Sequence, residues 1–135
     1  MDINDCKFIN LPKIEDSRGS ISFIEGNNHI PMALKRLYYI YDVPAGSKRG
    51  CHAHTDNYEL IIAISGSFDV LIDNGKSKKK FHLNRPHIGL FVPPMFWREL
   101  ENFSSESVCL VAASLEYDEG DYYRDYNDFL KAVES

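Results

Sequence analysis

Long apolar runs are missing from this chain of 135 residues. The longest apolar stretches, such as Leu60 to Ile64, are far shorter than the ~20 residues that a membrane-spanning helix needs. The first residues contain Asp2, Asp5 and Lys7 instead of a basic segment followed by an apolar one, so no secretory signal is predicted. These absences exclude a membrane helix and predict a cytoplasmic protein with no membrane partner.

Cysteine and positive charge are also scarce. The three cysteines, Cys6, Cys51 and Cys109, show no CxxC spacing and are predicted to be free thiols in a reducing compartment. Fifteen basic residues against 20 acidic ones leave a net charge of −5, which excludes a general nucleic-acid surface. The one basic run, residues 76–80, adjoins Asn74-Gly75 and is interpreted as a solvated hairpin turn.

Short β-rich runs separated by turn residues fill the chain from about residue 6 to residue 115. This regular spacing indicates a β-sandwich or barrel, and the length fits a single domain over residues 1–135. The predicted strands cover residues 6–9, 19–24, 35–41, 48–55, 57–65, 67–73, 79–83, 87–92, 96–100 and 107–113.

The last segment changes character, because aromatic and aliphatic residues from Tyr122 to Val133 recur every three or four positions. This period predicts a short amphipathic helix, with Asp121 as its N-cap. We expect its aromatic side to pack across the outside of the barrel or onto a second subunit.

A histidine pair stands at the centre of the most informative motif. His52 and His54 are two residues apart, so on a strand both side chains project to the same face. Glu59 follows on the next predicted strand and is expected to reach the same space. With Gly46 and Gly66 at matching distances, this pattern resembles the first cupin motif. The resemblance implies an all-β cupin, or jelly-roll, barrel with a short C-terminal helix.

The second cupin motif is altered in this chain. Arg98 stands where that motif supplies a further histidine ligand, and a guanidinium offers no lone pair to a metal. The prediction is therefore that no metal is bound. An alternative stays open, in which His52, His54 and Glu59 form the two-histidine, one-carboxylate site of a mononuclear metallocupin of the dioxygenase type.

Four short runs in order, residues 16–20, 35–40, 49–54 and 117–122, resemble those of the sugar nucleotide 3,4-ketoisomerases. The resemblance implies a homodimeric, metal-independent cupin that needs no cofactor. Its expected activity moves the ketone of dTDP-4-keto-6-deoxyglucose from C4 to C3 through an enediol. The 3-keto product would feed an aminotransferase that makes a 3-amino-3,6-dideoxy sugar for lipopolysaccharide or S-layer glycans.

Proton transfer at carbon and oxygen requires acid and base groups in the predicted pocket. His52 and His54 are the candidates at carbon, because an unperturbed histidine has a pKa of about 6.5 and serves as both acid and base. Which of the two takes the carbon proton is left open. Tyr38 is the candidate at the oxygens, and it shares a strand face with Arg36.

The charged substrate calls for arginines. Arg18, Arg36 and Arg49 lie in the matching runs and are predicted to bind the pyrophosphate through bidentate hydrogen bonds. Arg49 has the wrong parity to face inward unless Gly50 permits a β-bulge.

Two positions depart from the family pattern. Members carry glutamine where Glu59 stands and histidine where Arg98 stands. Both residues are counted among the substrate-binding groups. Two interpretations stay open: a compensating ion pair across the pocket, or a change in sugar specificity or in the stereochemistry of the product. Besides the metallocupin, two alternatives remain: a non-catalytic sugar-nucleotide-binding cupin and a related 3,5-epimerase.

Overall fold

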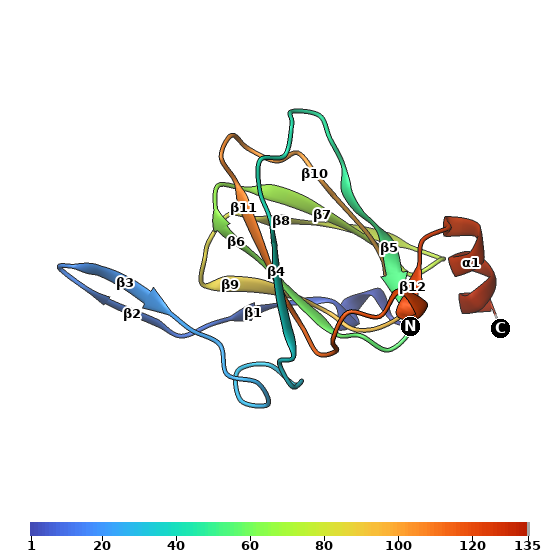
Figure 1. The fold of residues 1–135 in the computed structure, drawn as a ribbon, viewed down its shortest axis with the longest axis horizontal. Coiled ribbons are helices and arrows are strands. Elements are labelled where there is room, and N and C mark those ends of the chain that lie inside the picture. The colour runs from blue at the N-terminus through green and yellow to red at the C-terminus, as the bar shows by residue number, and fades with distance from the viewer. Residues whose placement is uncertain (135) are drawn as a thin grey trace.

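The computed structural model describes residues 1–134 and shows two facing β-sheets (Figure 1). The first sheet has the strand order β1 (Lys7–Asn10), β9 (Ile88–Val92), β6 (Glu59–Ser65), β11 (Val108–Ala113) and β4 (Arg36–Ile40). The second has the order β12 (Tyr122–Tyr123), β5 (Arg49–His54), β10 (Trp97–Glu101), β7 (Phe68–Asp73) and β8 (Lys78–Leu83). The sandwich confirms the predicted cupin-like fold.

The core lies between the two sheets. Phe68, Val70 and Ile72 alternate along β7 and are fully buried, as expected for a strand with one face toward the core. They belong to the same apolar cluster as Leu90 of β9 and Val111 of β11 in the opposite sheet. This cluster closes one part of the space between the sheets.

Each predicted strand overlaps an observed one, with ends that differ by a few residues. A further strand, β2 (Lys13–Asp16), was not predicted and pairs only with β3 (Gly19–Ser22). These two strands form an arm that extends away from the sandwich (Figure 1). Its apolar side chains Ile14 and Ile21 are 57% and 63% exposed.

The C-terminal helix begins later than predicted. Helix α1 covers Tyr126–Glu134, whereas Tyr122 and Tyr123 form β12 and pair with His54 and Ala53 of β5. The prediction that Asp121 caps the helix is therefore wrong.

The side chain of Asp125 accepts hydrogen bonds from the backbone N–H groups of Asn127 and Asp128 at 2.8 and 3.1 Å, and so fills the capping role. Helix α1 packs against the outside of the second sheet, where Phe129 is buried with Ala53 and Trp97. Within residues 1–134, no helix is long and apolar enough to cross a membrane.

Replacing Phe129 with alanine should lower the free energy of unfolding by about 3–5 kcal/mol, because it leaves a cavity between helix and sheet. Chemical denaturation measures the change. Asn127→Ala, at an exposed position of the same helix, is the control and should change stability by less than about 0.5 kcal/mol. Equal effects of the two variants would show that helix packing contributes little.

Candidate active site

A cavity of about 430 Å³ opens between the two sheets. Strands β4, β5, β6 and β10 each contribute a polar side chain to its wall, so residues far apart in sequence meet there. The predicted site residues that line it are Arg36, Tyr38, Arg49, His52, Glu59 and Arg98. Tyr122 and Arg124, which were not predicted, also line it.

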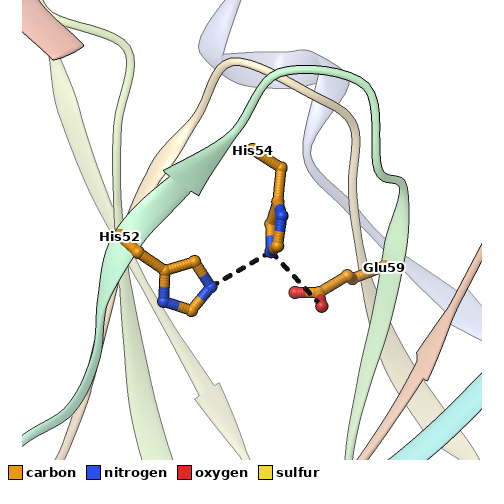
Figure 2. Close-up of side chains that lie close together, drawn as sticks. All are labelled: His52, His54 and Glu59. Atoms are coloured by element: carbon orange, nitrogen blue, oxygen red, sulfur yellow. Dashed lines mark hydrogen bonds and ion pairs between the residues drawn. The ribbon is translucent and has the colours of Figure 1, made fainter. Parts of the chain in front are cut away.

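The histidine pair lies on β5 with both rings directed inward (Figure 2). His52 lines the cavity, whereas His54 is fully buried behind it. The two Nε2 atoms are 3.1 Å apart. Burial, followed by the charge of Arg98, lowers the pKa of His52 to about 3. His52 is therefore uncharged at neutral pH.

A β-bulge shapes β5 just before the histidines. Gly50 has φ +83° and Cys51 has φ +50°, and the pairing register with β10 shifts between Arg98 and Glu99. This is the bulge that an inward-facing Arg49 requires, because it reverses the parity of the strand.

Glu59 is fully buried on β6 and accepts hydrogen bonds at both carboxylate oxygens. Oε1 accepts from Nη1 of Arg98 at 2.7 Å. Oε2 accepts from the hydroxyl of Tyr38 at 3.0 Å and from Nδ2 of Asn57 at 3.2 Å. The expected ion pair between Glu59 and Arg98 is thus present at the bottom of the cavity.

The electrostatic environment keeps Glu59 ionised and Tyr38 neutral. Burial raises the pKa of Glu59, but the neighbouring ring of His54, 3.5 Å from Oε2, and the charge of Arg98 outweigh it and lower the pKa to about 2. Burial and the negative charge of Glu59 raise the pKa of Tyr38 far above its usual value. Tyr38 is consequently a phenol that donates to a carboxylate.

Asp121 is a buried residue of the site. From the sequence it was predicted only as a helix cap, not as a site residue. It closes the 3-10 helix η2 (Glu119–Asp121), and its Oδ2 lies 3.0 Å from Nδ1 of His54. The ring of the next residue, Tyr122, packs beside both histidine rings. The only sequence signal for these two residues was their place in the run 117–122.

Positive charge collects at the rim of the cavity. The guanidinium of Arg36 lies over the rings of Tyr38 and Tyr117, and its Nε is buried without a hydrogen-bond partner. Arg124 lies over the ring of Tyr122 at 4.2 Å. A ligand oxygen is the natural partner for the free Nε of Arg36.

Arg18 is not brought to the cavity of its own chain. It lies at the turn between β2 and β3, where its side chain is 89% exposed and pairs with Asp16 at 2.7 Å. The arm carries it away from the sandwich (Figure 1). The prediction that Arg18 joins the other arginines therefore fails within a single chain, because local sequence did not reveal the direction of the arm.

The donor atoms of His52, His54 and Glu59 lie within 4.8 Å of one another, but their surroundings do not fit a metal ion. Oε2 of Glu59, the oxygen facing His54, already accepts two hydrogen bonds, and Oε1 is held by Arg98. The permanent charge of that guanidinium also opposes a divalent cation. The trio therefore lacks an available carboxylate ligand.

Two facing sheets with inward histidines on β5 define a protein of the cupin class. Comparison with known families makes this more specific, since residues 4–134 match the family model FdtA, described as WxcM-like, C-terminal. The chain belongs to this family.

Individual relatives agree with the family assignment. A TDP-4-oxo-6-deoxy-α-D-glucose-3,4-oxoisomerase of Aneurinibacillus thermoaerophilus is 43% identical over 94% of this chain and 91% of its own. A second relative is the 3,4-ketoisomerase QdtA of Thermoanaerobacterium thermosaccharolyticum, solved as a histidine-to-asparagine mutant with TDP-4-keto-6-deoxyglucose. It has a TM-score of 0.95 and 34% identity, and the match covers 99% of this chain and 96% of QdtA. The TDP-quinovose 3,4-ketoisomerase WlaRB of Campylobacter jejuni has a TM-score of 0.91 and 43% identity, and the match covers 96% of this chain and 99% of WlaRB.

Arg98→Met should destabilise the protein by about 3–5 kcal/mol, because it leaves the charge of Glu59 buried and unpaired. Denaturation at neutral pH measures the loss. Arg124→Met is the control, since Arg124 forms an equally short pair with Glu119 at the surface, where such pairs contribute about 0–1 kcal/mol. Similar losses in the two variants would contradict the importance of the buried pair.

Proposed function

We propose that this protein is a 3,4-ketoisomerase that acts on TDP-4-keto-6-deoxyglucose and yields the 3-keto isomer. The observation that carries the proposal is the meeting of His52, Tyr38 and the buried His54 in one cavity, in a chain that matches the family over residues 4–134. Relatives with this activity cover nearly the whole chain. The 3-keto product has the carbonyl that an aminotransferase needs to make a 3-amino sugar for surface glycans.

The reaction redistributes electrons within the sugar. A base removes the C3 proton, the C–H electron pair forms the C3–C4 double bond, and the former C4 carbonyl oxygen takes up a proton. The enediol then loses the proton of its C3 oxygen, the C3 carbonyl forms, and C4 receives a proton. Oxidation at C3 balances reduction at C4, so no external oxidant or reductant is required.

His52 is the proposed base at carbon. It lines the cavity, and its lowered pKa leaves its ring free of a second proton at neutral pH. A neutral imidazole has a lone pair that accepts the C3 proton. His54 lies behind His52 and does not line the cavity. Its effect on the substrate is therefore transmitted through His52.

Tyr38 is proposed to move protons between the two sugar oxygens. Its hydroxyl lies at the cavity wall and donates to Glu59 at 3.0 Å. Because its pKa is raised, the phenol keeps its proton until an oxygen with a developing negative charge accepts it. Glu59 holds the hydroxyl in place during this exchange.

The arginines at the rim are proposed to bind the pyrophosphate. Arg36 and Arg49 line the cavity beside Arg124, and planar guanidinium groups match phosphate oxygens. The ion pair of Glu59 and Arg98 lies deeper and is electrically neutral, so it suits the uncharged hydroxyls of the hexose. We assign these two residues to sugar binding.

We further propose a homodimer in which the arm of one protomer completes the cavity of its partner. The outer face of the first sheet beside the arm has a second hollow of about 770 Å³, lined by apolar residues that include Phe23, Leu34 and Leu110. Leu37 on this face is 60% exposed. Exposed apolar patches of this kind mark interfaces, and two-fold symmetry exchanges the two arms equally.

Incubation with TDP-4-keto-6-deoxyglucose should give the 3-keto isomer by NMR, with unchanged rate in excess chelator. In deuterated water, the C3 proton should exchange with solvent. His52→Asn should lower kcat by about 100-fold or more, as expected on removing an acid or base, whereas the control His82→Asn at an exposed position should retain full activity.

Other results of that experiment identify other functions. Tight binding without C3 exchange would indicate a non-catalytic binding protein, and exchange at C5 would indicate a 3,5-epimerase. Activity that is lost with chelator and restored by a metal would indicate the metallocupin.

Arg18→Ala should raise KM for the sugar nucleotide by about tenfold or more, since it removes a charged hydrogen bond to phosphate. Mixing Arg18→Ala protomers with His52→Asn protomers tests where Arg18 acts. If the arms exchange, each mixed dimer has one cavity with both native residues, and activity rises above that of either variant alone. No recovery after exchange of protomers would contradict the arm model.

A further inference from the structure

The hydrogen-bond partners of the histidine pair determine where its protons lie. Nδ1 of His52 is 2.8 Å from the carbonyl oxygen of Gly50. A carbonyl oxygen only accepts hydrogen bonds, so this nitrogen must carry a hydrogen. In a neutral His52, Nε2 is then a lone pair.

The same reasoning applies to His54. Its Nδ1 is 3.0 Å from Oδ2 of Asp121. The two oxygens of that carboxylate accept the backbone N–H groups of Asp56 at 2.7 Å and Asn57 at 3.3 Å. Asp121 is thus an acceptor on both oxygens, and Nδ1 of His54 is the donor. A neutral His54 also has its lone pair on Nε2.

Two neutral rings would therefore place two lone pairs face to face. The buried Nε2 atoms are 3.1 Å apart, which is a hydrogen-bond distance. With both rings neutral, however, no hydrogen would lie between them. Nε2 of His54 also faces Oε2 of Glu59 at 3.5 Å, another acceptor (Figure 2). Buried acceptors without a donor are costly, and one additional proton between the nitrogens removes this conflict.

The charges around the pair support one added proton. The groups that face it are Tyr38 on β4, Glu59 on β6, Arg98 on β10, Asp121 on η2 and Tyr122 on β12. Asp121 and Glu59 are hydrogen-bonded carboxylates and Arg98 is a cation, while Tyr38 is a neutral phenol. Among the buried charged residues that face the pair, one proton on the pair and the cation of Arg98 balance the carboxylates of Glu59 and Asp121. Arg36 is half-buried at the rim, where it reaches the hydroxyl of Tyr122.

We infer that His52 and His54 store one shared proton between their Nε2 atoms, and that Asp121 is the positioning residue that holds it there. The lowered pKa of His52 places this proton closer to His54. Asp121 contributes twice, by orienting the ring of His54 and by balancing its positive charge.

If the protein has the proposed function, the stored proton lets the histidine pair act as both acid and base. One proton on two rings supplies an acid in His54 and a base in His52. Loss of that proton at high pH removes the acid, and addition of a second at low pH removes the base. Activity is therefore expected in the pH range where the pair holds one proton.

NMR of the resting protein, labelled with ¹⁵N at histidine and free of substrate, tests the stored proton directly. Near neutral pH, the two rings should carry three N–H hydrogens, one on each Nδ1 and one shared by the Nε2 atoms. Two hydrogens in total, an unprotonated Nδ1, or a metal ion on the Nε2 atoms would overturn the inference. This measurement needs no turnover, so it is independent of the proposed reaction.

Asp121→Asn tests the positioning role. The pH at which the pair loses its shared proton should fall by about 1 to 3 units, the effect of removing a nearby opposite charge. The alkaline limit of kcat should fall with it, and Asp121→Glu should restore both. A merely structural role would lower kcat without moving either pH value, and that result would overturn the assignment of Asp121.

A surface contact offers the matched control. Nδ1 of His82 lies 2.7 Å from Oδ1 of Asp69 and the side chain of His82 is 56% exposed. Asp69→Asn removes a similar contact and should leave both pH values unchanged. If Asp121→Asn does not fold, the NMR result on the native protein decides the inference alone. Absent turnover with three N–H hydrogens would refute the proposed function while the stored proton stands.

Discussion

The buried ion pair between Glu59 and Arg98 is the interaction on which the site depends. Its partners are about 1% exposed and come from β6 and β10, which belong to opposite sheets. Removing two charges from water is costly, and additional hydrogen bonds offset that cost. Nε of Arg98 is left without a partner, so the carboxylate carries most of these bonds. Glu59 meets this need by accepting from Tyr38 and Asn57 as well. One carboxylate thereby joins the two sheets and orients the phenol at the cavity wall.

The cavity combines two electrostatic regions. Arg36, Arg49 and Arg124 make its rim positive, which suits the diphosphate of a sugar nucleotide. At the bottom, opposite charges compensate each other, which suits an uncharged hexose. Burial, and after it the same cation that stabilises Glu59, lowers the pKa of His52 and keeps it neutral. The ion pair of Glu59 and Arg98 thus lies beside a neutral His52 and leaves no free carboxylate for a metal ion.

The regular parts of the fold were predictable, since turn residues separate short β-rich runs at every strand of the two sheets except β12. The arm was missed because β2 is exposed along its whole length and so lacks the alternation that burial produces. The start of α1 was misplaced because Tyr122 and Tyr123 continue the helical period but pair with β5. Sheet pairing overrode local periodicity there, as tertiary contacts often do.

The sequence by itself determined which side chains share a strand face: His52 with His54, and Tyr38 with Arg36. This follows from the two-residue period of any β-strand. Only the tertiary structure decided that His52 meets the cavity while His54 lies behind it. It also decided that Asp121, 67 residues away, reaches His54. Local geometry is set by neighbouring residues, whereas contacts between distant segments exist only once the sheets have closed.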